Sequence, residues 1–246
     1  PMAGAGSRFA REGYTDPKPL IPINGVPMIR VVINNLTPSR PHRFIFVCQQ
    51  AHVEAYGLGE KLAKWAPGCE IVGLNGLTDG AACTVLSARD LINNQEELMI
   101  ANSDQYVDVA IDGYLDSMDK GDFDGLIMTM RANDPKWSFV GLDTNNLVTR
   151  VVEKEVISDE ATVGIYNFRH GHDFVAAADR MIARNLRVNN EFYVAPTYNQ
   201  LIEDGRRICI YNVGKEASGM YGLGTPDDLS LFLGLPVLAK ATEGFN

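Results

Sequence analysis

Short apolar, β-branched runs alternate with longer stretches of helical periodicity over the first 137 residues. The short runs predict strands at 44–48, 70–74, 98–101 and 126–130. Apolar residues three or four positions apart predict helices at 27–36, 52–65, 80–92 and 111–120. Strands and helices that alternate in this way are typical of an α/β fold, so we predict a mainly parallel sheet covered by helices.

The pattern changes after residue 137, where three strands follow one another closely. They are predicted at 138–142, 148–153 and 162–168, and they indicate an antiparallel insert. Helices at 173–184 and 193–204 lead to a strand at 207–212. A last helix is expected after Thr225, whose hydroxyl can cap free amides, and Pro226, which suits a first helical turn. We expect residues 1–246 to form a single domain.

Composition and charge narrow the class of partner. The net charge of −9 argues against a surface that grips nucleic acid, which requires clustered Lys and Arg. The four cysteines show neither a CxxC pair nor zinc-site spacing, so we expect reduced thiols. There is no long apolar run and no signal-like start, so we expect a cytoplasmic protein without membrane contact. The opening is turn-like, and we expect a short strand ahead of Pro1.

The stretch from Met2 to Phe9, MAGAGSRF, places two glycines and small residues in what we expect to be the first strand-to-helix turn. Glycine lets several amides approach a phosphate closely, and Arg8 adds a positive charge at the same place. An ordinary tight turn is the alternative interpretation. The stretch matches neither a full GxGxxG nor a GxxxxGK[ST] pattern.

Lys18 stands between Pro17 and Pro19. The two prolines hold this stretch extended and thereby fix the direction of the lysine, which is useful at a phosphate. A solvent-exposed lysine in a surface loop is the alternative.

Two further segments follow predicted strands. The strand at 98–101 leads to Asp104, and a carboxylate just beyond the end of a parallel strand lies where ligands bind in α/β sheets. Such a carboxylate can hold Mg²⁺ together with substrate phosphates, although a capping role is the alternative and Asp108 is a second candidate ligand. Asp79 and Gly80 lie between a predicted strand and a predicted helix, where backbone amides are free to bind a ligand. The alternative interpretation is a helix start that needs small residues.

The segments GAGSRF and PKPLIPINGVPMI together resemble the signature of the sugar-nucleotide pyrophosphorylase family. The resemblance implies a Rossmann-like nucleotidyltransferase fold, similar to that of GT-A glycosyltransferases. It implies catalytic roles for Arg8 and Lys18 at the triphosphate and a metal-binding role for Asp104. The nucleotide-binding positions that it implies are Ala3, Gly4, Ala5, Gly6, Ser7, Asp79 and Gly80.

Later segments resemble the acceptor-binding motifs of the same family. Glu153 and Lys154 match the first two residues of an EKP motif, with Glu155 in place of the proline. Gly164 matches the glycine of an AGIY strand, and Glu191 a glutamate of the GExEITD region. The resemblance therefore implies a nucleotide-binding part at 1–137, an acceptor-side part at 138–224 and a C-terminal helix at 225–246.

The chain departs from the family at its last motif, D-x-GT. Gly222 stands where the aspartate that completes the metal site is expected. We therefore expect Mg²⁺ or Mn²⁺ to be held by Asp104 with water and phosphates, or with a second acidic group such as Asp108.

The resemblance implies transfer of a nucleoside monophosphate from a nucleoside triphosphate to a sugar phosphate or a similar phosphorylated small molecule, with release of pyrophosphate. Such an enzyme serves nucleotide-sugar and polysaccharide biosynthesis, and a homo-oligomer is a further option. Two alternatives stay open: a glycosyltransferase that uses a finished nucleotide sugar, and a nucleotide-binding regulatory module without turnover, which Gly222 favours.

Overall fold

The computed structural model describes residues 1–4 and 6–245 of the 246-residue chain. The chain divides into two compact units, each assembled from separate segments. Unit 1 contains Pro1 and residues 78–101 and 113–215, and unit 2 contains residues 2–77, 102–112 and 216–246. The sequence-based division into a nucleotide-binding part (1–137), an acceptor-side part (138–224) and a C-terminal helix (225–246) concerns the roles of these parts and stays a prediction.

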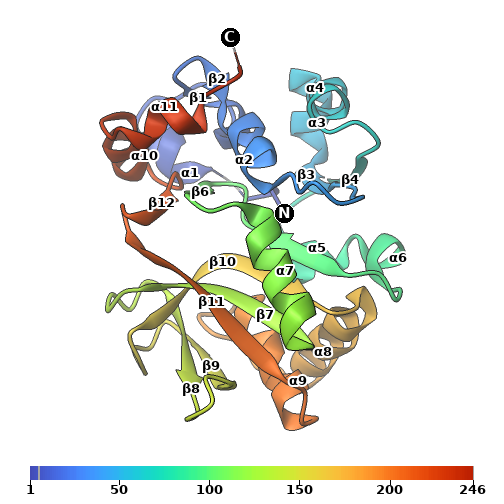
Figure 1. Cartoon of the computed structure of the whole chain (residues 1–246). Coiled ribbons are helices and arrows are strands. Elements are labelled where there is room, and N and C mark those ends of the chain that lie inside the picture. The colour runs from blue at the N-terminus through green and yellow to red at the C-terminus, as the bar shows by residue number, and fades with distance from the viewer. Residues whose placement is uncertain (5, 246) are drawn as a thin grey trace. The chain divides into compact units, whose positions relative to one another are not determined.

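The sheet of unit 1 has β7 (Gly125–Arg131) and β10 (Glu160–Phe168) at its centre (Figure 1). Strand β11 (Ile208–Glu216) pairs with β7 in parallel, whereas β10 pairs antiparallel with both β7 and β5 (Leu98–Ala101). Strands β5, β7 and β11 therefore run in one direction and β10 runs against them. The predicted α/β fold with a mainly parallel sheet is confirmed, with β10 as the exception.

The predicted antiparallel insert corresponds to a hairpin of β8 (Ser138–Leu142) and β9 (Val148–Glu153). Its turn is closed by the Asp143 carboxylate, which accepts hydrogen bonds from two amides of the turn. Strand β10 pairs antiparallel with β8 at Ala161, as the predicted insert requires, but it also pairs with β7 from Glu160 to Phe168 and so belongs to the central sheet. Because every residue of β10 is buried, the strand needs cover on both faces, which the centre of the sheet provides.

The helices of unit 1 pack around this sheet, and two predicted helices differ in extent. These elements are α5 (Ala81–Leu86), α6 (Arg89–Ile92), α7 (Ile111–Gly121), α8 (Gly171–Ala183), η2 (Ala195–Thr197) and α9 (Tyr198–Glu203). The predicted helix 80–92 is two short helices. The predicted helix 193–204 is regular only from Tyr198, because Phe192 instead bonds to Asp79 and Pro196 begins a separate 3₁₀ turn.

The first part of unit 2 contains the glycine-rich turn and a parallel strand pair. Its elements are α1 (Ser7–Arg11), η1 (Lys18–Leu20), β1 (Pro22–Ile23), β2 (Val26–Pro27), α2 (Met28–Leu36), β3 (Ile45–Gln49), α3 (Gln50–Tyr56), α4 (Leu58–Trp65) and β4 (Glu70–Leu74). Strands β3 and β4 pair in parallel, and Met2 extends the pairing through a parallel bridge to Cys48. The predicted helix 52–65 is broken at Gly57, whose φ of 57° is left-handed.

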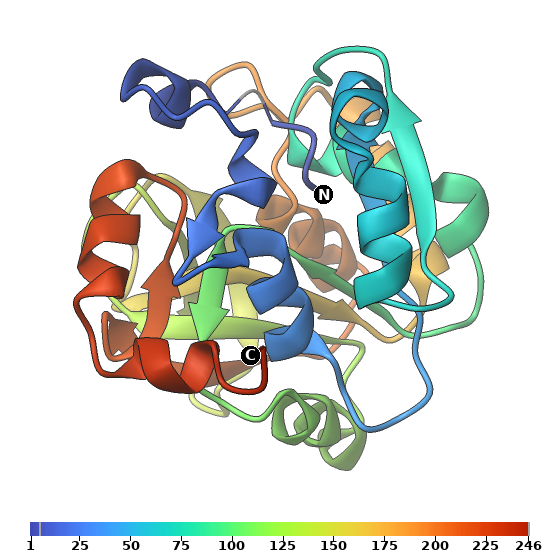
Figure 2. The same cartoon turned by 90° about the horizontal axis from the view of Figure 1, so that it is seen from above.

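The remaining segments of unit 2 close its core. Strand β6 (Gln105–Val107) pairs antiparallel with β12 (Gly219–Gly222), and α10 (Pro226–Leu233) and α11 (Val237–Ala241) follow. Leu223 and Phe232 pack with Phe9, Ile23 and Met28 in one buried cluster. Figure 2 shows α10 and α11 beside β1, β2 and α2, which supply much of that cluster. The predicted cap is confirmed, because the Thr225 hydroxyl accepts a hydrogen bond from the Asp228 amide at 3.1 Å.

All four cysteines carry free thiols, as the sequence predicts. Burial raises the pKa of the Cys48 thiol to about 11, so this side chain stays protonated and acts as a small apolar residue of β3. No helix in the described part of the chain is both long enough and apolar enough to cross a bilayer.

Substitution of Gly171 tests the packing of α8. A Cβ at this position would lie 1.9 Å from the Ile92 carbonyl oxygen, and the Gly171 amide is itself bonded to Glu96. We expect Gly171→Ala to lower the free energy of unfolding by about 2–3 kcal/mol, because backbone must move on both sides. The matched control is Gly113→Ala in α7, where the Cβ would make an ordinary contact; it should raise the stability by about 0.5 kcal/mol. Urea unfolding measures the free energy of unfolding of both variants. Similar changes in the two variants would contradict the close packing described for Gly171.

Candidate functional site

Lys18 and Asp104 form a partly buried ion pair in unit 2. The Lys18 Nζ atom lies 2.7 Å from Asp104 Oδ2, and the two side chains are 24% and 25% exposed. The prediction that this stretch is extended is wrong beyond Pro17, because Lys18–Leu20 form a 3₁₀ turn whose first positions accept proline. Pro19 is buried in that turn and holds the chain after Lys18. The lysine that the sequence places in a rigid stretch therefore points at the carboxylate that the sequence proposes as a metal ligand.

The glycine-rich turn lies against the same lysine. Gly6 adopts a left-handed φ of 61° at the start of α1, and a Cβ there would lie 3.7 Å from the Lys18 Cβ. A residue other than glycine would be strained at this φ. Gly4 is exposed, and no atom of the other described residues, its chain neighbours apart, lies within 4 Å of the position that its Cβ would take.

The other predicted residues of this turn have different surroundings. Ala3 is buried, and its carbonyl accepts a hydrogen bond from the Gln49 side chain. Ser7 and Arg8 are exposed at the start of α1. Ala5, predicted to bind nucleotide, lies outside the described residues. The structure thus places an exposed cationic side chain, Arg8, two residues after Gly6.

The loop before α10 closes on Asp104 from another side. The Leu223 amide donates to the Asp104 carbonyl at 2.8 Å, which continues the pairing of β6 with β12. A Cβ at Gly224 would lie 2.8 Å from Asp104 Oδ2, so only glycine leaves the carboxylate its position. The GT pair of the last motif and the proposed metal ligand are therefore neighbours in unit 2.

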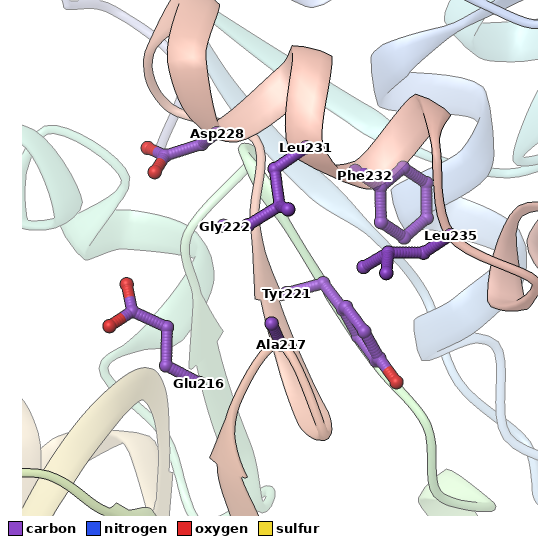
Figure 3. Close-up of a pocket in the computed structure, with 8 residues that line it drawn as sticks. All are labelled: Glu216, Ala217, Tyr221, Gly222, Asp228, Leu231, Phe232 and Leu235. Carbon is purple, nitrogen blue, oxygen red and sulfur yellow. The ribbon is translucent and has the colours of Figure 1, made fainter.

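Gly222, which replaces the expected aspartate, borders a pocket with an empty volume of about 240 Å³. A Cβ at Gly222 would lie 3.4 Å from the Asp228 Cγ, so the Asp228 carboxylate lies beside the vacant side-chain position. Figure 3 shows Asp228 and Glu216 on one side of β12 and the ring of Tyr221 on the other. The complete lining is Glu216, Ala217, Tyr221, Gly222, Asp228, Leu231, Phe232 and Leu235.

Asp108, the second candidate ligand, does not lie with Asp104. Four residues along an extended strand separate the two by roughly 13 Å, so they cannot share one ion. The Asp108 carboxylate pairs instead with Lys240 of α11. No group of three or more His, Cys, Asp or Glu that could hold a metal occurs among residues 1–4 and 6–245.

The donors present fit a magnesium ion that keeps most of its water. The Asp104 carboxylate offers oxygen ligands, and Mg²⁺ is commonly bound by one or two carboxylates plus substrate phosphates. In this structure Asp104 Oδ2 accepts a hydrogen bond from the Lys18 ammonium.

In unit 1, the turn of Asp79 and Gly80 is tied to Phe192. The Phe192 amide donates to the Asp79 carbonyl at 2.8 Å, and the Phe192 carbonyl accepts from Ala82 at 2.9 Å. Gly80 has a φ of 118°, and a Cβ there would lie 2.5 Å from the Phe192 oxygen. The Asp79 side chain pairs with Arg187 at 3.1 Å. The turn has a structural reason for its glycine, and its contact with a nucleotide stays a prediction.

Glu153, the last residue of strand β9, and Lys154, which follows it, have contrasting environments. Glu153 is 8% exposed and accepts a hydrogen bond from Ser138, and burial raises the pKa of its carboxyl. Lys154 is exposed with a left-handed φ of 59°, and its Nζ donates to the Tyr193 hydroxyl at 2.9 Å. Only the lysine is thus open to a ligand in this structure.

The other predicted acceptor residues lie on β10 and on the segment before η2. Gly164 has a φ of 78° within the register shift between Thr162 and Tyr166, which explains a glycine in a buried strand. Glu191 is exposed and interacts with Tyr193, the partner of Lys154. The sequence resemblance pointed to this segment through Glu191 but gave no signal for Tyr193.

Glu153→Gln tests the cost of the buried carboxyl. Because the folded protein holds this proton to a higher pH than the unfolded chain does, stability is lost as the pH rises through the raised pKa. We expect Glu153→Gln to be more stable than the wild type near pH 7, with an advantage that disappears at about pH 3, where the carboxyl is protonated in both states. Urea midpoints at both pH values measure this, with the exposed Glu155→Gln as control. An advantage that is independent of pH would contradict the assigned cause.

Comparison with known proteins agrees with this geometry. The family model described as nucleotidyl transferase matches residues 2–195. A nucleoside-diphosphate-sugar pyrophosphorylase from Vibrio cholerae RC9 has a similar structure, with a TM-score of 0.80, 25% identity, and coverage of 95% of this chain and 98% of that one.

Two further solved structures share the fold at lower identity. One is the inositol-1-phosphate CTP transferase from T. maritima, with a TM-score of 0.74, 15% identity, and coverage of 99% of this chain and 94% of that one. The other is a UDP-glucose pyrophosphorylase complexed with UDP-glucose, with a TM-score of 0.72, 17% identity and coverage of 93% of each chain. No curated protein matches the sequence significantly. Since the family model covers most of the chain, the protein belongs to the nucleotidyl transferase family.

Proposed function

We propose that the protein transfers a nucleoside monophosphate from a nucleoside triphosphate to a sugar phosphate or a similar phosphorylated small molecule and releases pyrophosphate. The observation that carries the proposal is the Lys18–Asp104 pair beside the Gly6 turn. A rigid ammonium, a carboxylate and a glycine turn are the groups that a triphosphate with its metal ion requires.

The nucleotide roles follow from the chemistry of the transfer. An acceptor phosphate oxygen attacks the α-phosphorus in line, and the reaction needs positioning and charge neutralisation more than a protein nucleophile. In the proposal the amides of residues 3–7 bind phosphate oxygens, and Arg8 holds the β- and γ-phosphates. Lys18 stabilises the charge that develops in the transition state.

The proposed metal ion is Mg²⁺ or Mn²⁺, with Asp104 as its protein ligand. When bound, the ion neutralises phosphate charge. The proximity of Asp228 to the vacant position at Gly222 makes it the second carboxylate to test. Before the ion can reach Asp104 Oδ2, the Lys18 ammonium must leave this atom, and a triphosphate offers the lysine new partners.

The proposed acceptor site uses residues of unit 1. Lys154 binds the acceptor phosphate, and Glu153, Gly164 and Glu191 contact its hydroxyl groups. Asp79 and Gly80 contact the base and ribose of the nucleotide. The buried state of Glu153 requires that an acceptor reach it through its second oxygen or displace Ser138. We place the reaction in cytoplasmic nucleotide-sugar biosynthesis that supplies polysaccharide assembly.

The deciding experiment measures pyrophosphate release for each nucleoside triphosphate with a panel of hexose 1-phosphates and inositol 1-phosphate. We expect one pair to give acceptor-dependent pyrophosphate, and Lys18→Ala to reduce its turnover by about a hundredfold or more in a folded protein. A glycosyltransferase would instead release a nucleoside diphosphate from a nucleotide sugar, and a regulatory module would bind nucleotide without turnover. Either result would overturn the proposal.

Metal binding in the absence of nucleotide gives a second prediction. Because Lys18 competes with any cation for Asp104 Oδ2, we expect Lys18→Ala to bind Mg²⁺ more tightly than the wild type in calorimetric titration, by about tenfold. Asp104→Asn should abolish this gain. The matched control is Lys240→Ala, which frees the Asp108 carboxylate at the other end of β6 and should leave Mg²⁺ affinity unchanged. An equal gain in both lysine variants would reflect net charge alone and would remove Asp104 from the metal site.

A further inference from the structure

We propose that Tyr193 is a positioning residue of the acceptor site, whose phenol holds the Lys154 ammonium in place for the acceptor phosphate. The inference rests on the proposed function and assigns a role to a residue outside the predicted site. Tyr193 acts through Lys154 and does not itself bind the acceptor.

The contact between the two side chains is specific in geometry. The Lys154 Nζ donates a hydrogen bond to the Tyr193 hydroxyl at 2.9 Å and lies 5.0 Å from the centre of its ring. The hydrogen bond to Tyr193 raises the pKa of Lys154, which keeps the ammonium charged. A lysine on an exposed strand end otherwise samples many rotamers, and fixing one of them before binding removes an entropic cost.

The backbone of Lys154 is bent to make this contact. Its φ of 59° is one that side-chain-bearing residues rarely adopt, and such outliers gather at functional sites. The family motif has proline at the next position, and proline restricts the preceding residue to extended backbone. Glu155 imposes no such restriction. The departure from the motif and the unusual conformation of Lys154 are therefore linked.

Tyr193 is itself well supported. The preceding residue, Phe192, is bonded through its amide to Asp79 and through its carbonyl to Ala82. The tight approach of Gly80 to Phe192 leaves this segment little freedom. A phenol on a backbone held at these points is a rigid anchor for a flexible lysine.

The test compares Tyr193→Phe, Lys154→Ala and the double variant by the kinetics of pyrophosphate release. The acceptor is varied at saturating nucleotide, and the nucleotide is then varied at saturating acceptor. Tyr193→Phe keeps the ring and should raise the KM for the acceptor about tenfold, with less than about twofold change in kcat and in the KM for nucleotide. Lys154→Ala should raise the acceptor KM further. The double variant should equal Lys154→Ala, because in this proposal Tyr193 affects the acceptor through Lys154 alone and not through its contact with Glu191.

The matched control is Tyr211→Phe in β11, which also removes one phenolic hydroxyl from unit 1. Within the described part of the chain, Tyr211 has a ring contact with Tyr114 and its hydroxyl makes no hydrogen bond, so wild-type kinetics are expected. Thermal unfolding of all variants checks that the fold is kept.

A second variant restores the family motif and should impair the enzyme. Glu155→Pro removes no hydrogen bond seen for the Glu155 amide in the described residues, yet it forces Lys154 towards extended backbone and away from Tyr193. We expect a rise in acceptor KM similar to that of Tyr193→Phe, and no further rise when the two changes are combined.

The outcomes separate the inference from the proposed function. A wild-type protein without pyrophosphate release for any substrate pair would overturn the proposed function and this inference with it. If the wild type turns over while Tyr193→Phe keeps the wild-type acceptor KM, the inference alone is wrong. Additive effects in the double variant would mean that Tyr193 contacts the acceptor directly, which also overturns the positioning role.

Discussion

The hydrogen-bonded ion pair of Lys18 and Asp104 is the contact on which the candidate site of unit 2 depends. It joins residues 86 positions apart, and each neighbour contributes a restriction. The flanking prolines aim the lysine, Gly6 lets the first turn approach it, and Gly224 leaves room for the carboxylate. A pair that is about a quarter exposed contributes only about 0–1 kcal/mol to stability. The restrictions around the pair therefore fix where the two opposite charges lie. They are not explained by the contribution of the ion pair to the stability of the fold, which is small.

The proposed acceptor residues of unit 1 follow another design, in which a rigid segment holds a mobile side chain. Phe192 anchors the backbone, Tyr193 holds the ammonium, and Lys154 accepts an unusual φ to reach it. Burial acts in the opposite sense on Glu153, where it raises the pKa and disfavours the charged form. At the end of β9 the surroundings thus favour the charged form of Lys154 and the neutral form of its neighbour Glu153.

The sequence predicted those features that local patterns determine. The bounds of β4, β5, β8 and β9 follow from short apolar runs between turn residues. The prolines around Lys18 were recognised as restrictions, but the 3₁₀ turn that they help to form was not predicted. Strands β6 and β12 were missed because they are short and, unlike β5, are not runs of apolar residues: β6 begins with Gln105, and β12 has a glycine at each end. The central place of β10 and the proximity of Asp228 to Gly222 depend on residues distant in sequence. The left-handed φ of Lys154 was not predicted for a different reason. The family motif has a proline after the lysine, and Glu155 stands in its place here, so the restriction that the proline would impose on Lys154 is missing.

The division of each unit into separate segments has a consequence for synthesis on the ribosome. Strand β6 finds its partner only when β12 has emerged, and β7 gains its parallel neighbour only with β11. Pairings so distant in sequence close slowly and leave strand edges exposed in the meantime. All segments of unit 1 have been made once residue 215 is added, whereas unit 2, which begins at Met2, must wait for residues 216–246. The nascent chain must therefore keep β6 from pairing with other chains until β12 has been made.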